Sequence, residues 1–192
     1  LPAVMRDRGD AIGGEAGRSL SAVMRRAAAL LVVAFTAAVL AGCSPDGPKF
    51  KSSDITGSSF GRDFALTDHT GKPRTLADYR GKAVVMFFGY TQCPDVCPTT
   101  LGTLAEAMKA LGPDADGVQV LFVTVDPERD TQSLLSQYVP AFDPRFVGLY
   151  GDAAATERVA KELKVLYQKQ PGATPSSDTV DHSAAVYAFD PQ

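Results

Sequence analysis

Apolar residues form two long runs in the middle of the chain, AVVMFFG at 83–89 and VQVLFVTV at 118–125. Both runs are rich in β-branched and aromatic residues, which is typical of strands buried on both faces of a sheet. Between them, apolar residues recur at helical spacing from Pro98 to Leu111, and Gly112 and Pro113 end that pattern. The pattern therefore predicts a strand, a helix and a second strand, the order of a parallel β-α-β unit.

Shorter patterns on both sides extend this alternation. Apolar residues at 64–66 and 74–76 flank turn residues at 68–71 and predict a β-hairpin. Later in the chain we expect helices over 131–138 and 153–163, strands over 146–150 and 183–189, an extended segment over 165–168 and a loop over 170–178. The predicted fold class is α/β, with an N-terminal β-hairpin and a central mixed sheet flanked by helices.

The first residues have the pattern of a bacterial export signal. Met24-Arg25-Arg26 is positively charged, and the apolar run 27–41 that follows is shorter than the ~20 residues needed to span a bilayer. The run ends in LAGC, which resembles a lipobox, where the cysteine becomes the lipidated first residue of the mature protein. We expect a lipoprotein signal peptide at 24–42 and a lipid on Cys43, anchoring the protein at the extracytoplasmic face of the plasma membrane. The alternative is an uncleaved helix with a buried cysteine.

The remaining boundaries follow from composition. Residues 1–23 precede Met24, which can itself serve as the start of translation, and we expect them to be an over-extension of the gene model. Residues 43–58 are rich in Ser, Gly, Pro and Asp and are expected to form a flexible tether. One folded domain is expected over 59–192. The formal net charge of -3 and the absence of a basic run argue against a nucleic-acid partner.

Two cysteines, Cys93 and Cys97, follow the first buried strand. We expect Pro94 to lie in the first turn of the next helix, whose N-terminus should lower the thiol pKa of both cysteines. Residues at i and i+4 lie one helical turn apart, which allows either a disulfide or a metal ion between the sulfurs. Two thiolates form a soft donor set that suits Cu(I), Zn(II) or an iron–sulfur cluster.

A metal site here needs a third ligand, and the chain contains two histidines. His69 lies in the predicted hairpin turn and is expected to be structural or solvent-exposed. His182 directly precedes the last predicted strand, where loops at one sheet edge form a ligand crevice. We favour His182 as the ligand over a loop histidine that caps a strand. Two thiolates and one imidazole fit Cu(I), and the same set with an added oxygen fits Cu(II).

Two carboxylates follow the second buried strand and are expected at the same sheet edge. Asp126 and Asp130 are possible accessory residues that tune the cysteines, help to bind Cu(II) or face a partner. A turn at Asp126 and a helix cap at Asp130 explain the same residues equally well.

Three motifs together resemble the Sco/SenC family of copper chaperones, whose fold is thioredoxin-like. They are FFGYTQCPDVCPTTL at 87–101, VDPERDT at 125–131 and DHSAAVYAFD at 181–190. The resemblance implies that Cys93, Cys97 and His182 are copper ligands. It also implies delivery of copper to the binuclear site of cytochrome c oxidase subunit II, or reduction of the cysteines of that site. The partner that supplies the copper or the electrons would be an extracytoplasmic copper donor or a thiol reductant. Measured against this family, we expect a C-terminal strand and helix to be missing.

Two activities stay open. The first is copper delivery. The second is thiol–disulfide exchange, in which Cys93 and Cys97 form a reversible disulfide that also empties the copper site. A thiol peroxidase is a weaker alternative, because no single activated cysteine with a nearby base is evident.

Overall fold

A computed structural model describes residues 24–26, 28, 51–58, 60–61, 64–174 and 177–191. The chain divides into two compact units, residues 1–55 and 56–192. In the first unit residues 24–26 and 28 are helical, and no described helix is long and apolar enough to cross a membrane. Cys43 and most of the predicted signal peptide lie outside the described residues. The boundaries expected at 23, 42 and 58 therefore stay predictions.

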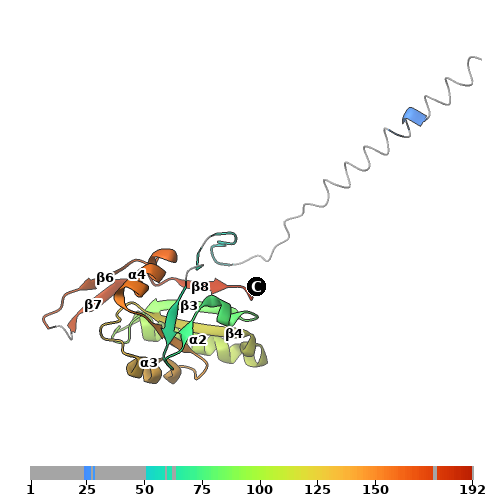
Figure 1. The fold of residues 1–192 in the computed structure, drawn as a ribbon. Coiled ribbons are helices and arrows are strands. Elements are labelled where there is room, and N and C mark those ends of the chain that lie inside the picture. The colour runs from blue at the N-terminus through green and yellow to red at the C-terminus, as the bar shows by residue number, and fades with distance from the viewer. Residues whose placement is uncertain are drawn as a thin grey trace, which may run out of the picture. The chain divides into compact units, whose positions relative to one another are not determined.

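A six-stranded mixed sheet forms the centre of the second unit, in the order β2-β1-β5-β4-β3-β8. Figure 1 labels its strands β4, β3 and β8. Its strands are β1 (Leu66–Asp68), β2 (Pro73–Arg74), β3 (Ala83–Gly89), β4 (Val118–Thr124), β5 (Val147–Tyr150) and β8 (Val186–Phe189). The two apolar runs pair in parallel along their whole length, from Ala83 opposite Val118 to Gly89 opposite Thr124. Their carboxyl ends therefore share one edge of the sheet, and the loops after Gly89 and Thr124 lie next to each other.

The predicted N-terminal hairpin is present as β1 and β2. The buried Asp68 carboxylate organises its turn, accepting hydrogen bonds from the backbone of Thr70 and Lys72 and from Arg74 Nε, at 2.8–3.0 Å. Burial by itself raises the pKa of Asp68, but these hydrogen bonds and one from the Thr70 hydroxyl outweigh it and hold the pKa well below its usual range. The turn is therefore built around an ionised carboxylate.

Helices flank the sheet, as the alternating pattern predicts. They are α2 (Val96–Leu111), α3 (Gln132–Tyr138) and α4 (Ala153–Glu162), with the 3-10 helices η1 (Leu76–Tyr79), η2 (Gly112–Gly117) and η3 (Val139–Ala141). The cap of α3 is Thr131 and not Asp130, because the Thr131 hydroxyl accepts a hydrogen bond from Leu134 N at 3.2 Å. At the end of α2, Gly112 adopts a φ of +56°, which favours glycine. The predicted α/β class with a central mixed sheet is confirmed.

A second, two-stranded sheet was not predicted. It is an antiparallel hairpin of β6 (Tyr167–Gln170) and β7 (Thr179–His182), which extends to one side of the main sheet (Figure 1). The expected extended segment at 165–168 is displaced by two residues, and His182 ends a strand instead of preceding one. The polar sequences YQKQ and TVDH contain no apolar run, so periodicity gave no strand signal there.

The last strand is shorter than expected, because β8 covers 186–189 instead of 183–189. Ser183 N donates a hydrogen bond to Leu166 O at 2.9 Å, so its backbone pairs beside the hairpin and not with β3. The pairing with β3 begins at Val186, opposite Phe87.

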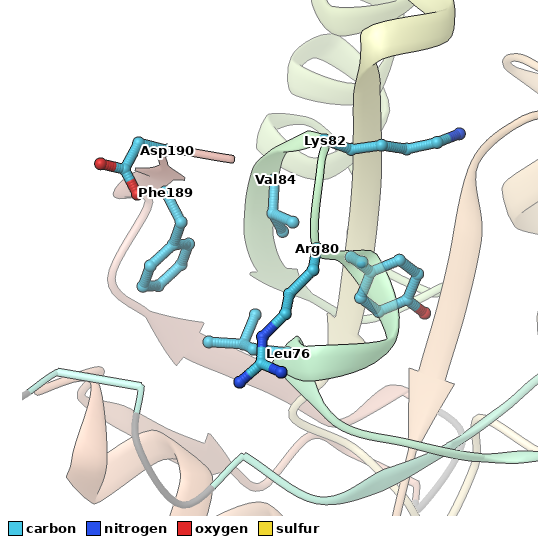
Figure 2. A pocket seen from close by; sticks show the side chains of 7 residues that line it. Leu76, Arg80, Lys82, Val84, Phe189 and Asp190 are labelled. Carbon is cyan, nitrogen blue, oxygen red and sulfur yellow. The ribbon is translucent and has the colours of Figure 1, made fainter. Parts of the chain in front are cut away.

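The core lies on both faces of the central strands. Phe87, Phe88 and Phe122 are fully buried, with Met86 and Leu121 beside them in the same two strands. A small surface pocket lies at the beginning of β3, lined by Leu76, Tyr79, Arg80, Lys82, Val84, Phe189 and Asp190 (Figure 2). Cys93 follows the opposite end of β3, so this pocket and the predicted metal site are at different ends of the strand.

Candidate metal centre

Cys93 lies in the connection between β3 and α2. After β3 the chain makes a turn in which Cys93 N donates a hydrogen bond to Tyr90 O at 3.2 Å, and α2 begins only at Val96. Cys93 and Pro94 are therefore outside the helix, and the expectation that Pro94 occupies its first turn is wrong. The turn, and not a shared helix face, brings the cysteines together.

Cys97 lies in the first turn of α2 and is fully buried. Its backbone N–H points at the other cysteine, with 3.4 Å between Cys97 N and Cys93 Sγ. Gly89 at the end of β3 makes room for the Cys97 sulfur, because a Cβ there would lie 2.7 Å from Sγ. Both cysteines are free thiols. A glycine at the end of the buried run, four residues before Cys93, was a signal that sequence reasoning missed.

The thiol of Cys97 has a pKa well above its ordinary value, which corrects the expectation that the helix N-terminus would lower it. Burial is the largest cause, and a hydrogen bond with Cys93 adds to it. A fully buried thiolate without a cation is strongly disfavoured, so Cys97 is a neutral thiol until something positive replaces its proton.

His182 completes the group from the far end of the chain. Its Nε2 lies 3.4 Å from Cys97 Sγ, and its Nδ1 lies 3.1 Å from the backbone oxygen of Ser183. A carbonyl only accepts, so Nδ1 carries the proton and Nε2 presents its lone pair to the sulfurs. The imidazole also meets the rings of Phe87 and Tyr90 edge to face, at centroid distances of 6.1 and 6.0 Å. The nitrogen is thus oriented from several sides.

The three predicted ligands therefore meet. The Cys93 and Cys97 sulfurs and one His182 nitrogen all lie within 4.8 Å of one another, and this is the metal-competent group found among the described residues. Two thiolates and one imidazole make a soft, three-coordinate donor set that matches Cu(I). A closed zinc site needs a fourth protein ligand, and this group offers three.

The two accessory candidates lie beside this group but outside it. Asp130 is buried and accepts hydrogen bonds from the hydroxyls of Thr91 and Thr124, both at 2.6 Å, and from Thr91 N at 3.0 Å. Burial raises the pKa of Asp130, and these hydrogen bonds partly offset it. Asp126 forms an ion pair with Arg129. Asp130 thus connects the loop between β3 and α2 that contains Cys93, called the cysteine loop below, to the end of β4. An accessory copper role stays a prediction for both carboxylates.

His69, the other histidine, has a structural role, which is one of the two alternatives expected for it. Its Nδ1 accepts a hydrogen bond from Gly148 N at 2.9 Å, which connects β5 to the turn after β1. Burial lowers the pKa of His69, and the neighbouring Asp68 opposes that shift. A neutral, half-buried ring whose acceptor nitrogen is already in use is poorly suited to bind a metal.

Arg129 is a residue of the VDPERDT motif to which sequence reasoning gave no role. Its side chain is only 13% exposed, and its guanidinium carbon lies 5.7 Å from the centre of the Tyr90 ring. Tyr90 is itself buried and contacts His182. The available signal for Arg129 was a charged residue in a short motif at the sheet edge where the metal site was expected. Two of its hydrogen-bond partners could not be predicted, because they lie 37 and 49 residues away in sequence.

Comparison with known proteins gives one consistent result. A family model described as SCO1/SenC matches residues 52–192. The mouse (Mus musculus) protein named SCO2 homolog, mitochondrial, is 42% identical over 131 residues, which are 67% of this chain and 51% of the relative. The chain spans about half the length of the curated relatives it matches.

Solved structures agree with this match. Bradyrhizobium japonicum ScoI with copper bound is 43% identical, with a TM-score of 0.66 over 69% of this chain and 83% of that one. Yeast Sco1 with copper bound is 34% identical, with a TM-score of 0.64 over 70% of this chain and 75% of that one. The expected thioredoxin-like fold is thereby confirmed.

Proposed function

Because this chain belongs to the SCO1/SenC family, we propose that it binds copper through Cys93, Cys97 and His182 and serves the assembly of cytochrome c oxidase. The observation that carries the proposal is the meeting of these three soft donors within 4.8 Å in a single buried corner of the fold. The finer proposal is that copper passes to the binuclear site of subunit II. The protein would act at the extracytoplasmic face of a bacterial plasma membrane, anchored through a lipid on Cys43.

Copper is the cargo in this proposal, and the chain's own residues set how it is taken up. The Cys97 thiol keeps its proton in the buried, metal-free site, so binding a cuprous ion has to displace that proton. His182 faces the sulfurs through Nε2, because its Nδ1 is engaged with the backbone oxygen of Ser183. Cys97 is fully buried, while Cys93 is 8% exposed and His182 is half-buried, so the ion is accessible from the Cys93 and His182 side. An acceptor thiolate can approach from that side.

The test is a titration of the reduced protein with Cu(I) in competition with a chromophoric chelator. We expect one tight equivalent and a fall of more than about a hundredfold in affinity for His182→Ala, beyond the ~10–100-fold typical of outer-shell changes. The matched control is His69→Ala, which removes the other histidine and should leave copper affinity unchanged. Unchanged affinity in His182→Ala would remove this residue from the site.

Thiol–disulfide exchange is the second candidate, favoured by two free thiols whose sulfurs lie within 4.8 Å. In this reaction one thiolate attacks a client disulfide and the second resolves the mixed disulfide. Two electrons and two protons pass to the client, and Cys93 and Cys97 end as a disulfide. Reduction of an oxidised subunit II copper-site peptide distinguishes the candidates. His182→Ala should keep this activity, while Cys93→Ser and Cys97→Ser should abolish it.

A further inference from the structure

His182 reaches the cysteines from a part of the fold that the main sheet does not hold. It ends β7, whose partner in the two-stranded sheet is β6 (Figure 1). A ligand nitrogen is useful only if its position is kept to a fraction of an ångström. The contacts that hold this hairpin against the cysteine loop therefore decide how accurately His182 Nε2 is placed beside the two sulfurs.

Arg129 joins the three segments that meet here. Its Nε pairs with the Asp126 carboxylate in the loop after β4. Its Nη1 donates to Gln92 Oε1 at 3.1 Å, next to Cys93, and to Asp178 O at 2.8 Å, just before β7 begins. One planar group thus connects the β4 loop, the cysteine loop and the hairpin that carries His182.

The same guanidinium also supports the ring on which His182 rests. Its carbon lies 5.7 Å from the centre of the Tyr90 ring, and that ring meets the imidazole at 6.0 Å and 86°. Arg129, Tyr90 and His182 therefore form a continuous series of contacts, in which a cation–π contact holds the Tyr90 ring and an edge-to-face contact holds the imidazole.

A second link between the same segments is much weaker. Lys169 in β6 pairs with Glu128 at 2.9 Å and with Asp178 at 3.4 Å. Lys169 and Glu128 are 45% and 73% exposed, and exposed ion pairs contribute little because water and salt screen them. The buried, multiply bonded guanidinium is the stronger connection.

The burial of Arg129 also lowers the stability of the fold. Its Nη2 is shielded from solvent and has no hydrogen-bond partner among the described residues. An unpaired buried donor lowers stability, so the arrangement is poorly explained by stability alone. The position of Arg129 is better explained by the geometry that it imposes on the three segments it joins.

We infer that Arg129 is a positioning residue that sets the place of His182 in the copper site by clamping the β6–β7 hairpin and the Tyr90 ring to the cysteine loop. The inference rests on the proposed copper function. Lysine keeps the positive charge but has a single ammonium, which cannot reproduce the planar, forked contacts to Asp126, Gln92 and Asp178.

The test is a double-mutant cycle on Cu(I) affinity with Arg129→Lys and His182→Ala. Arg129→Lys alone should weaken binding by about tenfold, the range of outer-shell changes at metal sites. In the His182→Ala background the same change should have little further effect, because the residue through which it acts is gone. Arg158→Lys, an exposed arginine on α4, is the control and should bind like the wild type. An equal loss in both backgrounds, or no loss in either, overturns the inference.

A measurement on the metal-free protein separates this inference from the copper function. In Arg129→Lys, amide hydrogen exchange should quicken in β6 and β7 and stay unchanged in β3 and β4, and the His182 ring nitrogen resonances should move. If the wild type binds no copper while these changes occur, the copper function fails and the clamp stands. If exchange in the hairpin matches the wild type, the clamp fails whatever the protein binds.

Discussion

The Nε2 atom of His182 lies 3.4 Å from the sulfur of Cys97, although 85 residues separate the two in sequence. The contact joins the end of a small peripheral hairpin to the first turn of the helix that follows the central strand. It converts a cysteine pair, which could serve as a disulfide alone, into a three-donor site. Substitutions around this corner should therefore affect metal binding and stability separately, according to what each side chain contacts.

Gly89→Ala should lower both stability and copper affinity, because Gly89 makes room for the Cys97 sulfur. The added Cβ would lie 2.7 Å from Cys97 Sγ and 2.9 Å from Phe122 Cε2, and neither neighbour is free to move in a packed core. We expect a loss of about 1–3 kcal/mol in the free energy of unfolding, the usual cost of overpacking, together with weaker Cu(I) binding. Urea denaturation of the reduced, metal-free protein measures the first effect.

Gly102→Ala is the matched control for this change. Gly102 lies within α2, and a methyl group added there would have nothing within 4 Å, so alanine should raise stability by about 0.5–1 kcal/mol. Wild-type stability and copper affinity in Gly89→Ala would show that the sulfur has more room than the structure gives it.

Asp130→Asn should separate the structural role of this residue from its possible copper role. The amide replaces one acceptor oxygen with a donor where Thr91 and Thr124 both donate, so we expect a loss of about 1–3 kcal/mol in unfolding free energy. Copper affinity should stay near that of the wild type. Asp114→Asn, at an exposed position in η2, should change neither quantity. Lower Cu(II) affinity at unchanged stability would instead assign Asp130 to the site.

Stability should depend on pH through His69. The folded state lowers the pKa of His69 below the ordinary 6.5, so the unfolded chain binds a proton first on acidification. Unfolding is then favoured, and stability falls as the pH drops through about 6.5, with a slope of at most about 1.4 kcal/mol per pH unit from this group. Denaturation between about pH 8 and pH 5 measures it. His69→Gln should flatten that curve, and an unchanged curve would contradict the assignment.

Oxidation should switch copper binding off. A Cys93–Cys97 disulfide removes both thiolates, leaving His182 as a single weak ligand. Protein oxidised before titration should bind no tight Cu(I), and reduction should restore one equivalent. Mass spectrometry of alkylated thiols confirms the redox state in each sample. Tight binding by the fully oxidised protein would place the copper elsewhere.

Local patterns in the sequence determined much of this protein. The apolar runs at 83–89 and 118–125 identify strands buried on both faces, and the 3.6-residue periodicity between them identifies α2. Once those strands are parallel, both following loops must share an edge. The two cysteines, a distant histidine and their soft chemistry were therefore readable without coordinates, because they depend on short-range spacing and on ligand preference.

Tertiary structure alone decided the rest. The β6–β7 hairpin is polar, so the hydrophobic pattern of the sequence did not predict it. This hairpin nevertheless places His182 beside Cys97. The Cys97 pKa is raised and not lowered, because complete burial outweighs the helix terminus, and burial is a property of the packed fold. The partners of Arg129 lie up to 49 residues away, so its role follows only from contacts between segments that no local pattern connects.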